Sequence, residues 1–141
     1  MILHKKLTIH APAQKVFAYW ADFQNFQQLI NLIESIEVID DKKSRWKIQA
    51  PLGHKIYFES LITVFKPAKQ LSWESSHADG HARGELRLTE SGENTFVELD
   101  FEYNLHREWM QNIARVVNYF GFPSQAFDHG LRRIKEKIET Q

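Results

Sequence analysis

A long run of strands in the middle of the chain is its strongest structural constraint. Between residues 35 and 105, apolar and polar residues alternate in six segments that short polar turns separate. A seventh segment of the same kind runs from Leu3 to His10. Because alternation with a period of two is typical of strands with one buried face, the pattern predicts an antiparallel sheet of seven strands.

Helical spacing is found on either side of the six-strand run. Apolar residues predict a short helix from about Ala13 to Trp20, and Asp22 is placed to cap a second helix that reaches about Ile33. Beyond Arg107, apolar residues recur every three or four positions, with an interruption before Pro123. The stripe consists of Met110, Ile113, Val117, Phe120, Phe127, Leu131, Ile134 and Ile138.

These elements predict an α+β fold of the helix-grip type. A curved seven-stranded antiparallel sheet would wrap around a long C-terminal helix, and two short helices would follow the first strand. The chain has 141 residues and shows no repeat, low-complexity tract or linker, so a single domain over residues 1–141 is expected.

The inward face of the sheet is predicted to carry large rings beside small or hydroxylated residues. Such a face can line a cavity as well as fill a core, with the long helix as the opposite wall. The predicted ligand-binding residues are Trp46, Phe58, Ser60, Trp73, Ser75, Thr95, Phe101, Tyr103, Met110, Ile113 and Val117. In this set, Ser75, Thr95 and Tyr103 would orient the ligand through their hydroxyl groups.

Catalytic chemistry has little support in this pattern. Between Trp46 and Tyr103, the inward positions contain no Asp, Glu or Lys, and no serine has a histidine predictably beside it. Tyr103 is the one inward proton donor of note, so it would act if the protein were an enzyme. The pattern therefore favours binding over catalysis and assigns no catalytic residue.

Metal and cofactor sites are not predicted. His77 and His81 bracket Asp79, but zinc needs three or four ligands held at rigid positions, and Gly80 makes this segment a flexible turn. With no cysteine in the chain, disulfides and thiolate ligands are excluded, which agrees with a reducing, cytoplasmic location.

Charge and hydropathy limit the expected partners. The 18 basic and 18 acidic side chains cancel, whereas nucleic-acid binding usually needs a basic excess, so no nucleic acid is expected. No segment is long and apolar enough to be an integral membrane span, and the alternating N-terminus does not resemble a signal peptide. A small hydrophobic ligand is the predicted partner, a protein partner remains possible, and the sequence does not define the oligomeric state.

Six segments spread over nearly the whole chain carry a family resemblance: IHAPAQKVFAYWADFQNF, SRWKIQAPLG, LSWES, ARGELRL, TFVELDFEY and GFPSQAFDHGLRRIKEKIE. In order and spacing they resemble the START-like (SRPBCC) superfamily, in particular its bacterial polyketide cyclase/dehydrase and lipid-transport branch. The resemblance implies a cavity between sheet and helix that holds a lipid, polyketide, quinone or other aromatic ligand. It implies no shared set of catalytic residues.

Three functional hypotheses follow from these observations. The first is binding or carriage of a hydrophobic ligand in the cavity between the sheet and the C-terminal helix. The second is a cyclase or dehydrase that acts on a polyketide-like substrate, with Tyr103 as its proton donor. The third is a protein-interaction module whose cavity is collapsed, since the resemblance implies that some START-like relatives act as chaperone activators or ribosome-binding factors.

Overall fold

The strands of the computed structural model form one antiparallel sheet of seven, as predicted. The structure describes residues 2–29, 33–49, 55–77, 80–105 and 123–141. The strand order is β1-β7-β6-β5-β4-β3-β2, so the first strand lies beside the last. The strands are β1 Ile2–Ile9, β2 Ile33–Val38, β3 Lys43–Gln49, β4 Lys55–Lys66, β5 Gln70–His77, β6 Gly80–Ser91 and β7 Asn94–Leu105.

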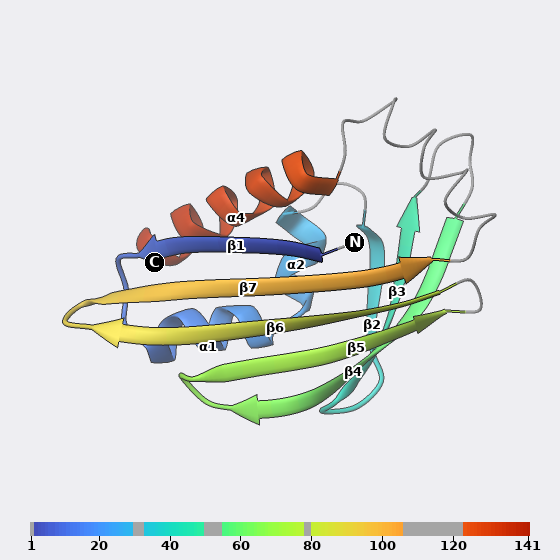
Figure 1. The fold of residues 1–141 in the computed structure, drawn as a ribbon, viewed down its shortest axis with the longest axis horizontal. Helices are drawn as coiled ribbons and strands as arrows, with labels where there is room; N and C mark the ends of the chain where they lie inside the picture. Colours follow the sequence, from blue (N-terminus) through green and yellow to red (C-terminus); the bar gives the residue numbers. More distant parts are fainter. Residues whose placement is uncertain (1, 30–32, 50–54, 78–79, 106–122) are drawn as a thin grey trace.

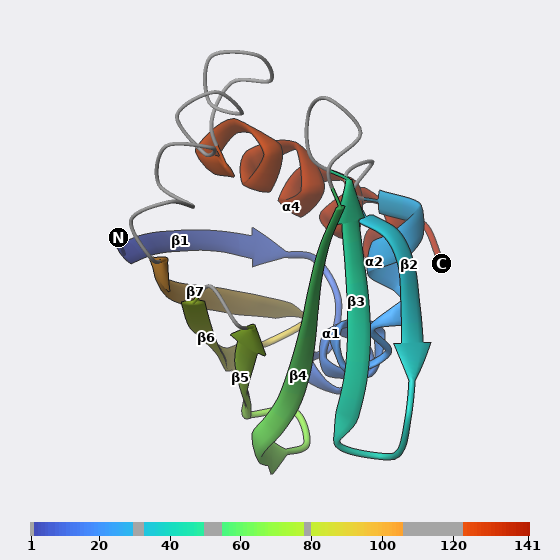
Figure 2. The ribbon, with the colours of Figure 1, turned by 90° about the vertical axis from the view of Figure 1, so that its right-hand side faces the viewer.

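The sheet curves around the helices and leaves its other face open (Figures 1 and 2). Two short helices follow β1, α1 at Ala13–Ala21 and α2 at Gln24–Leu29, and α4 spans Pro123–Glu139. Figure 2 shows all three inside the bend that the sheet makes between β1 and β2. This arrangement confirms the predicted α+β helix-grip fold. None of the helices in the described residues is long and apolar enough to cross a membrane.

The second helix is shorter than the sequence predicted. Helix α2 ends at Leu29, whereas Ile33 opens β2, pairs with Ile48 and is buried. The register of β2 shifts between Ile33 and Ser35, so Ile33 and Ile36 both reach the core although they are three residues apart. A bulge of this kind changes the period of two locally. The apolar spacing therefore resembled a helix, and the predicted end near Ile33 is wrong.

The core lies between the concave face of the sheet and the helices. Leu71, Leu86 and Leu99 form a row of cross-strand partners on β5, β6 and β7, and each is buried. Helix α1 contributes Ala13, Val16, Phe17 and Trp20, and α4 contributes Leu131, Ile134 and Ile138. Each fully buried aliphatic side chain of this kind contributes about 1.5–3 kcal/mol relative to exposure.

Polar contacts attach both ends of α4 to the N-terminal part of the chain. Near its first turns, Asp128 accepts an ion pair from the Nζ of Lys5 on β1, at 3.0 Å. At the other end, the backbone N–H of His10 donates to Oε1 of Glu139 at 3.0 Å. The predicted helical stripe before Pro123, with Met110, Ile113, Val117 and Phe120, lies outside the described residues.

Thr95 joins β7 to the segment that follows β1. Its side chain is completely buried, and its Oγ1 donates to the carbonyl oxygen of Ala11 at 2.7 Å. The backbone partner of Thr95 on β1 is Ile9, which is also fully buried. The Thr95 hydroxyl thus satisfies a carbonyl at the point where the chain leaves the sheet for α1.

We expect Thr95→Val to lower the free energy of unfolding by about 1–3 kcal/mol, because the Ala11 carbonyl would lose its donor in a buried site. Valine keeps the shape of threonine, so packing is conserved. Urea unfolding followed by circular dichroism measures the change. Thr89→Val, at an exposed position of β6, is the matched control and should change stability by no more than about 0.5 kcal/mol. Equal effects of the two substitutions would contradict this role.

Candidate functional site

Four aromatic rings gather on the concave face near β3, β4 and β5. Trp46 and Phe58 are cross-strand partners, and their rings stack with centroids 5.6 Å apart and planes 19° apart. Phe23, which precedes α2, meets Trp46 edge-on at 5.7 Å and Trp73 at 6.3 Å. Phe23 is buried, whereas the other three rings are only half-buried. Part of their surface therefore remains available to another apolar group.

A row of serine hydroxyls crosses the same face. Ser44, Ser60 and Ser75 are successive cross-strand partners on β3, β4 and β5, and they are 2%, 3% and 9% exposed. The Oγ of Ser75 donates to Ser60 at 3.3 Å, and the indole N–H of Trp46 donates to Ser44 at 2.8 Å. These small residues separate the row of Trp46 and Phe58 from that of Trp73.

Trp73 lies directly over Gly84, its cross-strand partner on β6. A Cβ atom built at Gly84 would stand only 2.2 Å from Cζ2 of Trp73 and 2.4 Å from its Cε2. On the other side, Gly84 pairs with Phe101 of β7, which is half-buried. The missing side chain at Gly84 therefore provides the space in which the indole lies.

The structure brings some of the predicted site residues together and places others elsewhere. The residues near the aromatic cluster are Trp46, Phe58, Ser60, Trp73, Ser75 and, through Gly84, Phe101. Thr95 lies six residues from Phe101 along β7, roughly 20 Å away. The backbone of Tyr103 pairs with Ala82. The side chain of Tyr103, together with Met110, Ile113 and Val117, lies outside what the structure describes.

Two members of the site were not predicted from the sequence. Phe23 was not among the predicted ligand-binding residues, although its ring closes the cluster over Trp46 and Trp73. Ser44 was not among the predicted inward residues. Its position two residues before Trp46, and hence on the same face, was the available signal.

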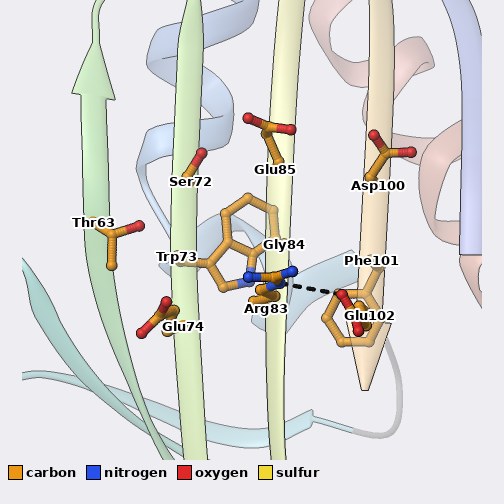
Figure 3. Close-up of a pocket in the computed structure, with 10 residues that line it drawn as sticks. All are labelled: Thr63, Ser72, Trp73, Glu74, Arg83, Gly84, Glu85, Asp100, Phe101 and Glu102. Carbon is orange, nitrogen blue, oxygen red and sulfur yellow. Dashed lines mark hydrogen bonds and ion pairs between the residues drawn. The ribbon is translucent and has the colours of Figure 1, made fainter. Parts of the chain in front are cut away.

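Charged side chains of the central strands occupy the opposite, convex face. There a hollow of about 380 Å³ is centred on the row of Trp73, Gly84 and Phe101. Figure 3 shows charged and hydroxyl side chains around it, with the helices behind the sheet. Its other lining residues are Thr63, Ser72, Glu74, Arg83, Glu85, Asp100 and Glu102. One pair of them is bonded across the strands, since Nε of Arg83 donates to Glu102 at 3.2 Å. The hollow thus shares Trp73 with the aromatic cluster, but its charged lining residues lie on the convex face.

Asp100 is the centre of an ionic network that links three strands of the convex face. It forms a hydrogen bond with Nδ1 of His4 on β1 and accepts another from Arg87 on β6, at 2.8 Å. The hydrogen bond from His4, and then those of Arg87, hold the pKa of Asp100 below its ordinary value of 3.8, against the opposing effect of burial. Arg87 is also bonded to Glu85 and Glu98. The network cross-links β1, β7 and β6.

Lys5 is a charged residue that alternates onto the concave face of β1. It is the backbone partner of Leu99, and its side chain is 23% exposed. Its ammonium group is 3.0 Å from Asp128 of α4, so its charge is matched at the edge of the concave face. The residues next to Trp73 on the concave face of the described strands, such as Ile62, Leu71, Ser75 and Gly84, are apolar, glycine or hydroxylated.

Comparisons with known proteins agree with this architecture. A family model described as polyketide cyclase / dehydrase and lipid transport matches residues 3–139. The crystal structure of a Deinococcus radiodurans protein is 28% identical, with coverage of 99% of this chain and 98% of that one, and a TM-score of 0.75.

Two more distant structures share the fold. An aromatase/cyclase from Streptomyces is 17% identical, with 99% of this chain and 93% of that chain covered, and a TM-score of 0.75. A START superfamily protein from Mycobacterium smegmatis is 12% identical, with 99% and 97% covered and a TM-score of 0.71.

We expect Asp100→Asn to make stability less sensitive to acid. Because the pKa of Asp100 is lowered in the folded state, its stabilising contribution is complete above the ordinary value of 3.8 and is lost as the pH falls through the lower folded-state value. Thermal unfolding between about pH 6 and pH 2 measures the slope. Asp41→Asn, in an exposed turn, is the control and should retain the wild-type slope. A wild-type slope in Asp100→Asn would contradict the stabilising role of the network.

Proposed function

The chain belongs to the polyketide cyclase / dehydrase and lipid transport family, and on that premise we propose that it binds a small hydrophobic ligand between the concave face of its sheet and its helices. The observation that carries the proposal is the cluster of half-buried rings on a concave face. Trp46, Phe58 and Trp73 are only half-buried, although their neighbours Ile62 and Leu71 are buried. Rings in this setting bind apolar ligands by excluding water from both surfaces.

The energy available from such contact is sufficient for useful affinity. At about 25 cal/mol per Å² of apolar surface, a ligand that buries roughly 300 Å² would gain about 7 kcal/mol before the cost of immobilisation. Stacking on the pair of Trp46 and Phe58 would add a further contribution of about 0.5–1.5 kcal/mol. We include the predicted wall of Met110, Ile113 and Val117 in this proposal as the surface opposite the rings.

The chemistry of the face favours a neutral ligand. Ser60 and Ser75 are bonded to one another, and Ser44 accepts from Trp46, so the serine row is largely satisfied within the protein. A charged ligand group placed against these rings would lose its hydration without a matching charge from the described concave residues next to Trp73. We therefore propose that the ligand is apolar or aromatic and carries no charge in the part that contacts the rings.

We expect Phe58→Ala to weaken binding of an aromatic probe by roughly tenfold, because it removes one side of the ring stack with Trp46. Native mass spectrometry of the purified protein first identifies any co-purifying ligand. Titration with 1-aminoanthracene, a neutral fluorescent three-ring probe, then measures affinity. Phe96→Ala, on the convex side of β7, is the matched control and should bind normally. Unchanged affinity in a folded Phe58→Ala protein would show that the ligand does not contact this ring.

Cyclisation or dehydration of a polyketide-like substrate is the second candidate, because the description of the matching family includes both activities. Tyr103 is the residue proposed as proton donor in this case. We expect Tyr103→Phe to remove most turnover if the protein is an enzyme, since phenylalanine lacks the proton, and to leave ligand affinity within about twofold if it is a carrier. Product analysis by mass spectrometry after incubation with a linear poly-β-ketone separates the two. Equal product formation by the wild-type and Tyr103→Phe proteins would exclude Tyr103 as the proton donor.

A further inference from the structure

We propose that Trp73 and Gly84 together determine which ligands the concave face accepts. The indole of Trp73, which lies on the bare backbone of Gly84, offers one face to a flat ring system and its N–H to a neutral oxygen of that ligand. This inference rests on the proposed binding function and makes it more specific. Its ligand class is a planar ring compound with a carbonyl, ether or hydroxyl oxygen.

The close approach of the two residues explains why position 84 is a glycine. Its φ angle is not in the left-handed region, so its backbone conformation is one that any residue adopts. What excludes a side chain is the indole, since the three atoms nearest to a Cβ at position 84 are Cζ2, Cε2 and Cη2 of Trp73, at 2.2 to 2.9 Å. Glycine inside a strand weakens the strand. The loss of strand stability at Gly84 is offset by the close packing of the Trp73 indole that the glycine allows.

Because the indole of Trp73 lies close to the backbone of the sheet, it leaves space between the sheet and the helices at this point. Trp73 and Phe101 flank Gly84 as its partners on β5 and β7. A side chain at position 84 would lift the indole away from the sheet and into the space above it. Because the ring of Phe23, just before α2, lies 6.3 Å from that of Trp73 between centroids, the lifted indole would also press on Phe23. Both movements narrow the space between sheet and helix.

Trp73 differs from Trp46 in its hydrogen bonding. The N–H of Trp46 donates to Ser44, so it is not available to a ligand. The N–H of Trp73 makes no hydrogen bond with any residue that the structure describes. Trp73 is only half-buried, and the nearest serines on its face are bonded elsewhere. A donor of this kind gains from an acceptor oxygen that a ligand brings.

The charges around the site define the kind of oxygen. Asp, Glu, Arg and Lys side chains next to Trp73 along the strands, such as Glu74, Arg83 and Glu85, stand on the convex face. Lys5, the concave lysine of β1, is paired with Asp128. Among the residues that the structure describes on this part of the face, a carboxylate would therefore meet no unmatched cation. A single indole N–H matches a neutral carbonyl or hydroxyl oxygen.

Two ligands of nearly equal shape test the donor. We would measure the affinities of 2-acetylnaphthalene and 2-ethylnaphthalene by isothermal titration calorimetry, because only the first has an acceptor oxygen. The wild-type protein should prefer the acetyl compound by about fivefold, as one net hydrogen bond provides. Trp73→Phe should abolish this preference. A preference that persists in Trp73→Phe would overturn the role of the N–H.

Variants at position 84 test whether the glycine allows the indole of Trp73 to lie against the sheet. Gly84→Ala should weaken the binding of both naphthalenes at least about tenfold. Gly84→Ala combined with Trp73→Phe should restore binding, because phenylalanine lacks the outer ring of the indole, but it should not restore the preference for the acetyl compound. Ser76→Thr adds one methyl group at an exposed site of β5 and is the matched control. The fluorine NMR signal of 5-fluorotryptophan at position 73 should move in Gly84→Ala before any ligand is added.

The outcomes separate this inference from the proposed function. Binding of both naphthalenes by Gly84→Ala with the affinity of Ser76→Thr would overturn the inference and leave ligand binding intact. Binding of dodecanoic acid but of neither naphthalene would do the same. Failure of the wild-type protein to bind naphthalenes, 1-aminoanthracene and dodecanoic acid would overturn both. If Gly84→Ala does not fold, the inference is tested by whether Trp73→Phe still prefers 2-acetylnaphthalene to 2-ethylnaphthalene.

Discussion

Hydrogen-bond ladders that run without a shift from β5 to β7 determine which residues face the helices. They place Trp73, Gly84 and Phe101 in one row and the buried Leu71 and its partners in the next. Moving one strand by a single residue would bring the charged alternate residues onto the concave face and expose the apolar ones. The burial of the leucine row therefore also sets the position of the aromatic cluster. Stability and the composition of the site have the same cause.

The two faces of the sheet divide the work of the side chains. On the convex face, ionic groups such as Asp100 and Arg87 connect neighbouring strands and remain in contact with water. On the concave face, hydrogen bonds are formed by serine hydroxyls and by the indole of Trp46. This separation keeps charge away from the rings. It leaves a face that is apolar in area but has a few donors and acceptors, as small-molecule sites generally do.

Much of the fold could be predicted because it depends on periodicity. The strands, α1 and the position of the turn around Gly92, which has a φ of 62°, follow from alternation, helical spacing and turn residues. The exceptions arise where the period is interrupted. The bulge in β2 made Ile33 look helical, and the lone Phe23 belongs to no periodic segment although its ring meets Trp46.

The site was predictable only as a set of inward residues. Alternation placed Trp46, Phe58, Trp73 and Thr95 on the same face, but it contains no information on which of them meet. The register of the strands separates Thr95 from the rings, and the hydrogen bond to Ala11 uses its hydroxyl. The contact of Trp73 with Gly84 depends on cross-strand pairing, which sequence patterns do not define.

The pairing of β1 with β7 also bears on how the chain folds. Ile2 has its backbone partner in Glu102, and Ile9 has its partner in Thr95, so the first strand finds its neighbour only after about a hundred residues. Closing a loop of that length costs entropy before the contact stabilises anything, and such topologies fold slowly. During synthesis, β1 would leave the ribosome long before β7. During that interval β1 has no partner strand and could associate with other chains. The positive charges of Lys5 and Lys6 oppose such association.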